Sequence, residues 1–147
     1  MQITKENLTI IIVTIKSRNI IDDCLKSIDP SIKKIIVENS SDREFVEYLK
    51  KKYENIECYL TGKNLGMGAG NNFGIKKSNT RYVMVLNPDT ILKTDTLSQI
   101  FEISKNLEFS ILSPLSDNKD YPNYKINNKQ EKNESDLFEV NQVDGYA

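Results

Sequence analysis

The sequence contains no histidine, although it is 147 residues long. Histidine is the commonest general base in enzymes and the commonest zinc ligand in proteins. Its absence excludes Ser-His and Cys-His dyads, because both need an imidazole beside the nucleophile. Any catalysis by this chain must therefore rest on carboxylates, amides and a hard cation that prefers oxygen ligands.

Cysteine, net charge and long apolar runs are also scarce. The two cysteines, Cys24 and Cys58, form no CxxC pair, so we interpret them as reduced, buried thiols instead of a disulfide or a metal site. The 20 basic and 21 acidic side chains give a net charge of -1, which excludes the positive field that gathers nucleic acid. Apolar runs are short and flanked by polar residues, so we expect neither a signal peptide nor a membrane span, and a cytoplasmic location.

The sequence does contain a regular alternation of β-branched runs and helical patterns. Strands are predicted at 8–14, 35–37, 56–60, 82–86 and 109–112. Helical spacing of apolar residues occurs at 20–28, 45–49 and 97–104, and another helix is expected to open in the second half of the glycine-rich stretch 62–74. This alternation predicts an α/β fold in which a mostly parallel sheet is covered by helices on both faces. The runs 8–14 and 82–86 predict buried strands.

Composition changes towards the end of the chain. Residues 1–115 are expected to form the α/β domain, whereas 116–136 are rich in Asn and Lys and are expected to form a polar, flexible segment. Strand-like alternation resumes in 137–147, so we expect the start of a further segment there and a chain that is the front portion of a longer protein. The sequence indicates no oligomeric state.

Four polar or glycine-rich clusters follow the predicted strands. They are Thr14 with the loop after it, Glu38-Asn39-Ser40, the stretch from Asn64 through Gly66 and Asn72 to Gly74, and Asn87-Pro88-Asp89. The carboxyl ends of parallel strands share one edge of a sheet, where α/β proteins bind ligands. We therefore expect these clusters to meet in one crevice.

Each cluster also has a purely structural interpretation. Ser17 or Asn19 could cap a helix, and so could Ser41 or Asp42 beside Glu38. The glycines 66, 68 and 70 either let the backbone approach a ligand or permit tight packing at a helix start. Asp89 beside Asn87 suits Mg²⁺ or Mn²⁺, but one carboxylate is too little for a protein-only site, so the metal would arrive with a diphosphate.

Taken together, these clusters resemble the family 2 glycosyltransferases with the GT-A fold, particularly their rhamnosyltransferase-like branch. The matching pieces are Val13-Thr14, residues 37–42, Asn64-Leu65-Gly66 with residues 71–74, and residues 86–90; Val143-Asp144-Gly145 is a weak further match. The resemblance spans residues 8–115, and the order and spacing of the pieces are more specific than any single piece.

The resemblance implies a nucleotide-diphospho-sugar donor, a divalent cation and transfer with inversion to the hydroxyl of a saccharide or lipid-linked saccharide. Thr14 and Glu38 would lie near the base and ribose, and Asn64 and Gly66 would line the donor cleft. Asn39, Asn72 and Asn87 would also bind the donor, and Asn87 and Asp89 occupy the metal-binding motif, with Asp89 as the metal ligand. Bacterial surface polysaccharide synthesis is the usual setting, which allows association with the inner face of the membrane.

The chain departs from the family pattern at two positions. Glu38 stands where the family usually has Asp, and Asn87 replaces the first Asp of the metal motif. The family's catalytic base lies in a later segment, so the resemblance implies donor binding by this chain and leaves transfer by this chain alone open. The alternatives are a nucleotidyltransferase-like enzyme and a non-catalytic, flavodoxin-like interaction domain.

Overall fold

The structure is a computed structural model that describes residues 2–114, 124–125 and 142–143. The chain divides into two compact units, Met1–Glu108 and Phe109–Ala147. Within the second unit, β5 (Tyr124–Lys125) and β6 (Gln142–Val143) form an antiparallel pair. The rest of the predicted segments 116–136 and 137–147 lies outside the described residues.

The first unit is built on one sheet of four strands in the order β3-β2-β1-β4. Its strands are β1 (Leu8–Thr14), β2 (Lys33–Glu38), β3 (Ile56–Leu60) and β4 (Tyr82–Leu86). All three pairings are parallel, so the carboxyl ends of the four strands share one edge. The predicted α/β class with a parallel sheet is confirmed.

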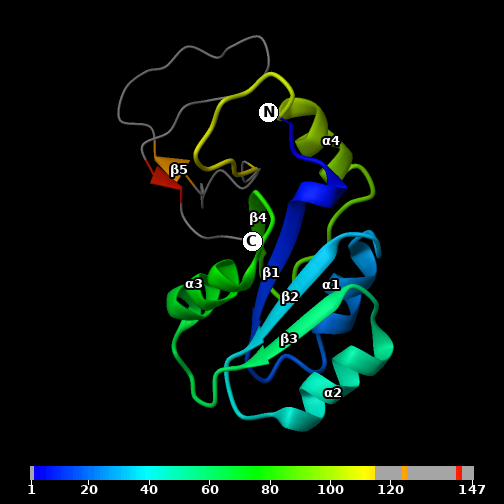
Figure 1. The fold of residues 1–147 in the computed structure, drawn as a ribbon, viewed down its shortest axis with the longest axis vertical. Helices are drawn as coiled ribbons and strands as arrows, with labels where there is room; N and C mark the ends of the chain where they lie inside the picture. Colours follow the sequence, from blue (N-terminus) through cyan, green and yellow to red (C-terminus); the bar gives the residue numbers. More distant parts are fainter. Residues whose placement is uncertain (1, 115–123, 126–141, 144–147) are drawn as a thin grey trace. The chain divides into compact units, whose positions relative to one another are not determined.

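Helices cover both faces of this sheet (Figure 1). A short 3₁₀ turn, η1 (Lys5–Asn7), precedes β1; α1 (Ile21–Ser27), α2 (Arg43–Lys52) and α4 (Thr96–Ile103) follow β1, β2 and β4, and α3 (Met67–Lys77) follows β3. The α1, α2 and α4 helices enclose the larger apolar core with one side of the sheet, and α3 covers the other side through Phe73. Because successive side chains of a strand point to opposite faces, Ile10 and Ile12 of β1 join the first core and Ile11 joins the second.

The strand β1 is buried on both faces, as predicted, but β4 is not. Val83 and Val85 remain 36% and 41% exposed, whereas Leu86 is buried. These two valines lie beside β1 residues on the α3 side of the sheet, where α3 packs mainly over β1 and β2. Within the described residues β4 is an edge strand, so the prediction of a buried strand at 82–86 is correct for one face only.

One further local prediction is wrong. Residues 109–112 form no strand, and Ile111 is 77% exposed, because this short run pairs with none of the described strands. The helix expected to open in the second half of the glycine-rich stretch is confirmed: α3 begins at Met67, with Gly66 as its N-cap at φ 81°. Most of the glycine-rich stretch is therefore helical.

Glycines inside α3 serve close packing of the helix against the sheet. A Cβ at Gly70 would lie 2.9 Å from Cγ1 of Val13, and one at Gly74 would lie 2.5 Å from Cγ2 of Ile11. The two positions are four residues apart, so both lie on the helix face that meets β1. Of the glycines 66, 68 and 70, Gly70 fits the interpretation of tight packing at a helix start, and Gly66 supplies a positive φ. Gly74, further along the helix, packs against the sheet in the same way as Gly70.

The α1 and α2 helices are joined by Asp22, which holds three partners. Its carboxylate accepts hydrogen bonds from the hydroxyls of Tyr48 (2.8 Å) and Tyr53 (2.7 Å) and pairs with the Lys52 ammonium. Burial alone would raise the pKa of Asp22, but the bonds from Lys52, Tyr53 and Tyr48 outweigh it and lower the pKa to about 2. Asp22 therefore stabilises the fold as a carboxylate.

We expect Asp22→Asn to lower the free energy of unfolding at pH 7 by about 1–2 kcal/mol, because bonds to a charged acceptor are lost. The contribution of a carboxylate with a lowered pKa is complete above its ordinary value of 3.8 and disappears as the pH falls through about 2. Urea unfolding at pH 7 and pH 3 should show the two proteins converging at the lower pH. The control is Asp23→Asn, because the Asp23 side chain is 73% exposed and its ion pair with Lys26 has a long N–O distance of 3.6 Å. An equal loss of stability in both variants would contradict the prediction.

Candidate functional site

A cavity of about 380 Å³ opens where the carboxyl ends of the strands meet. The residues that line it are Val13, Ile15, Ser17, Asn39, Asn64, Gly66, Met67, Asn87, Pro88 and Asp89. They come from the ends of β1, β2 and β4 and from the loop that leads into α3. Segments far apart in the sequence therefore converge because the sheet is parallel.

Five of the predicted site residues line this cavity: Asn39, Asn64, Gly66, Asn87 and Asp89. Three others do not. Thr14 and Glu38 are buried in the sheet, and Asn72 is exposed on α3. The crevice expected from the sequence thus exists, and five of the eight predicted site residues line it.

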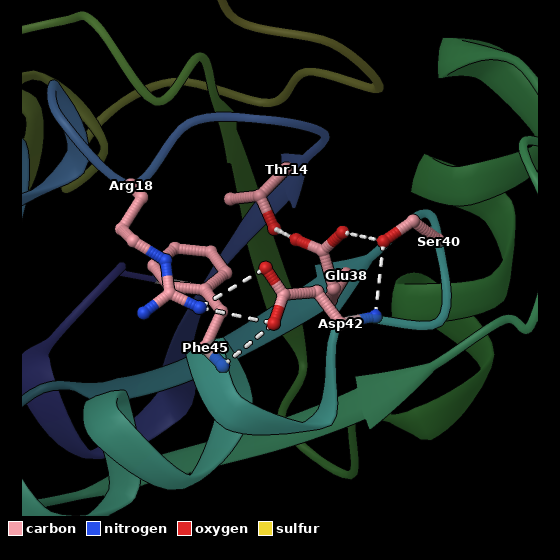
Figure 2. Close-up of polar contacts among 6 residues, drawn as sticks. All are labelled: Thr14, Arg18, Glu38, Ser40, Asp42 and Phe45. Carbon is pink, nitrogen blue, oxygen red and sulfur yellow. Dashed lines mark hydrogen bonds and ion pairs between the residues drawn. The ribbon is translucent and has the colours of Figure 1, made fainter.

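Glu38 and Thr14 bond to each other across the two central strands. They are direct neighbours in the β1–β2 register, and Thr14 Oγ1 donates to Glu38 Oε2 at 2.6 Å. Ser40 Oγ donates to the other carboxylate oxygen, Oε1, so both oxygens of Glu38 are engaged (Figure 2). Glu38 is 1% exposed. At this exposure Glu38 presents almost no surface to a base or ribose.

The loop after β2 is fixed by Asp42, which caps α2. Its carboxylate accepts from the Phe45 backbone N–H at 2.9 Å and from the Arg18 guanidinium at 3.0 Å, and Arg18 lies 5.3 Å from the centre of the Phe45 ring (Figure 2). The Phe45 N–H, with Arg18 next, lowers the pKa of Asp42. The capping role considered for Asp42 is confirmed, and Arg18 links the loop after β1 to it.

The segment Asn87-Pro88-Asp89-Thr90 forms a turn that is in contact with Cys24 of α1. The Thr90 N–H donates to the Asn87 carbonyl at 3.1 Å, and the Cys24 thiol lies 3.6 Å from the same oxygen. Burial, with a smaller contribution from the Asp89 charge, raises the pKa of Cys24 to about 11. Cys24 is thus a protonated, buried donor, in agreement with its interpretation as a reduced thiol.

The turn carries one polar group without a partner. Thr90 Oγ1 is buried and makes no hydrogen bond within the described part of the chain. The Asp89 side chain beside it is exposed at the cavity. Among the residues the structure describes, no three or more His, Cys, Asp or Glu side chains cluster closely enough to hold a metal ion.

The sequence reasoning missed the apolar part of the lining. Ile15 is 42% exposed and Met67 is 57% exposed, although both are large apolar side chains. Both line the cavity, where apolar surface suits the faces of rings in a ligand. The available signal was position, because Ile15 follows the last residue of β1 and Met67 opens α3.

None of the helices in the described ranges is long and apolar enough to cross a membrane.

This chain is similar to a curated hexosyltransferase and to a solved structure. The low-salt glycan biosynthesis hexosyltransferase Agl10 of Haloferax volcanii is 32% identical over 113 residues, which cover 74% of this chain and 36% of that protein. The crystal structure of S. aureus TarS 1-349 is similar with a TM-score of 0.56 and 19% identity over 63% of this chain and 30% of TarS. The same protein in complex with UDP-GlcNAc gives the same score, identity and share of this chain, and 29% of TarS.

These relatives bear on the fold and the family in different ways. The likeness to TarS supports the predicted GT-A-type architecture of a parallel sheet with helices on both faces. The chain spans about a third of the length of the relatives it matches. Residues 9–145 match the description "Glycosyl transferase family 2", which is most of the chain, so the chain belongs to this family.

Proposed function

We propose that this chain binds a nucleotide-diphospho-sugar in the cavity at the strand ends and forms the donor-binding part of an inverting glycosyltransferase. The observation that carries the proposal is the convergence of Asn39, Asn64, Gly66, Asn87 and Asp89 on one cavity. Membership of glycosyl transferase family 2 and the likeness to a protein crystallised with UDP-GlcNAc support it. Ile15 and Met67 would supply the apolar surface for the rings of the donor.

A divalent cation, Mg²⁺ or Mn²⁺, would bind at Asp89 with Asn87 nearby. Carboxylate and amide oxygens are the ligands such hard cations prefer, and Asp89 is exposed at the cavity, so the residues fit. One protein carboxylate leaves most coordination positions to diphosphate oxygens and water. When bound, the cation would neutralise the charge that develops on the leaving diphosphate.

The remaining predicted donor residues act from outside the cavity lining in this proposal. Thr14 and Glu38 fix the ends of β1 and β2, and so set the loops that carry Ile15 and Asn39. Their direct contact with base or ribose would need a rearrangement that exposes these two buried side chains. Asn72 lies on α3 and would reach the donor at its exposed side.

The reaction itself would be an in-line attack of an acceptor hydroxyl on the anomeric carbon, with a carboxylate removing the hydroxyl proton. No residue within the described part of the chain is assigned as that base, and the one conceivable stand-in, Asp144, lies outside it. The acceptor would be a saccharide or a lipid-linked saccharide of bacterial surface polysaccharide synthesis. We place the reaction in the cytoplasm, at or near the inner face of the membrane.

Thermal unfolding with a panel of nucleotides tests the proposal. A ligand at 100 times its dissociation constant stabilises a protein by about 2.7 kcal/mol, and so should raise the Tm of this chain by roughly 8–15 °C. We expect this rise with UDP or dTDP, or their sugars, together with Mn²⁺ or Mg²⁺. A response to nucleoside triphosphates alone would support a nucleotidyltransferase-like enzyme, and a response to none would support an interaction domain.

A further inference from the structure

The buried amide of Asn39 clamps the loop that leads into α3. Its Oδ1 accepts from the Leu65 backbone N–H at 2.9 Å, and its Nδ2 donates to Asn64 Oδ1 at 3.1 Å and to the Gly66 carbonyl at 3.2 Å. A backbone N–H can only donate, so the Leu65 contact fixes which end of the Asn39 amide is oxygen. Asn39 is 2% exposed, so its amide group bonds to the protein and offers almost no surface to a ligand.

The Asn64 amide is fixed by the same reasoning. Its Oδ1 accepts from the Gly66 backbone N–H at 2.8 Å and from Asn39 Nδ2 at 3.1 Å, which occupies both lone pairs. Its Nδ2 has no hydrogen-bond partner among the described residues. Asn64 is exposed and lines the cavity, so its two N–H donors can bond to a ligand there.

The Gly66 carbonyl is occupied as well, since it receives bonds from Asn39 Nδ2 and from the Gly70 N–H. Within the described part of the chain, the Asn64 side chain therefore has two unused donors and no unused lone pair, which favours ligand atoms that only accept, such as phosphate or carbonyl oxygens. We propose that Asn39 is a positioning residue that holds the Asn64 amide with its N–H donors towards an acceptor oxygen of a nucleoside diphosphate. This inference rests on the proposed donor-binding function and adds how one of its recognition groups is oriented.

The test is Asn39→Asp, which keeps an oxygen for Leu65 but replaces the donor to Asn64 with a second oxygen. The Asn64 amide should then turn to donate to the new carboxylate, which removes its N–H donors from the cavity. We expect calorimetric titration with UDP and Mn²⁺ at pH 8 to show about tenfold weaker binding than wild type, the size of one lost hydrogen bond.

Lowering the pH distinguishes positioning from a general structural defect. A buried carboxyl group facing two carbonyl oxygens has a raised pKa, and below it the protonated group can again donate to Asn64 Oδ1. The ratio of the variant's Kd to the wild-type Kd at the same pH should therefore fall towards one at pH 5.5. The matched control is Asn79→Asp, because Asn79 is exposed and bonds to Lys33 at the opposite edge of the sheet; its ratio should stay near one at both values.

The outcomes separate the two proposals. No binding of UDP by the wild type overturns the proposed function and this inference together. Wild-type binding with an unchanged affinity in Asn39→Asp, or a loss of affinity that is the same at both pH values, overturns this inference alone. Should Asn39→Asp fail to fold, Asn64→Asp keeps the acceptor for Gly66 but has no donors, and unchanged binding by it also overturns the inference.

Discussion

Asp89→Ala is expected to weaken the binding of UDP in the presence of Mn²⁺ by about 100-fold, which corresponds to about 2.7 kcal/mol. Asp89 is exposed at the cavity, and no cluster of three or more acidic, histidine or cysteine side chains within the described residues could replace it. Removing its carboxylate should therefore leave the cation with the diphosphate and without a protein carboxylate. Calorimetric titration measures the loss directly.

Two controls isolate the role of the metal. With EDTA in place of Mn²⁺, wild type and Asp89→Ala should bind UDP equally weakly, because the interaction through the cation is gone from both. Asp95→Ala removes the same charge from an exposed residue that bonds to Gln99 at 2.7 Å and does not line the cavity, so its affinity should equal that of wild type. Equal Mn²⁺-dependent affinity of Asp89→Ala and wild type would remove Asp89 from the metal site.

Gly74→Ala is expected to destabilise the fold by about 1–3 kcal/mol, the usual effect of adding a methyl group to a filled interface. The new Cβ would lie 2.5 Å from Ile11 Cγ2 and 3.0 Å from Val37 Cγ2, both in the centre of the sheet. Either α3 moves away from the sheet or the strands give way. A Tm lower by roughly 4–20 °C should result for a unit of this size.

Gly68→Ala is the matched control in the same helix. Nothing lies within 4 Å of a Cβ at that position, so only the helix propensity changes, and alanine should stabilise α3 by up to about 1 kcal/mol. The two changes should therefore shift the Tm in opposite directions. A higher Tm in Gly74→Ala would show that Gly74 does not touch the sheet as closely as the distances indicate, whereas a lower Tm in Gly68→Ala would contradict the propensity argument.

The sheet and the cavity at the carboxyl ends of its strands could be predicted because their signals are local. The β-branched run at 8–14 specifies a buried strand, and a parallel arrangement brings its end beside those of β2 and β4 whatever the details of the loops. Asn39, Asn64 and Asp89 were therefore placed at one crevice from their positions after strands. Family resemblance added the chemistry that such a crevice serves.

The errors arose where a distance between elements decides the outcome. Nothing in the run 82–86 tells an edge strand from a central one, and residues 109–112 lack a described partner strand. The sequence alone also leaves two interpretations of the glycine-rich stretch open, because only the separation between helix and sheet shows that Gly74 must lack a side chain. Likewise, the hydroxyls that occupy Glu38 come from a neighbouring strand and its own loop.

The order of the strands also bears on how the chain acquires its crevice during folding. β1 pairs with β2 across a single helix, but with β4 only after two strands and three helices have intervened. Loop-closure entropy makes the distant pairing slower, so a nucleus of β1, β2 and their helix can form before β4 arrives. We therefore expect Asp89 to join the amides of Asn39 and Asn64 only when β4 pairs with β1, so that the cavity is completed late in folding.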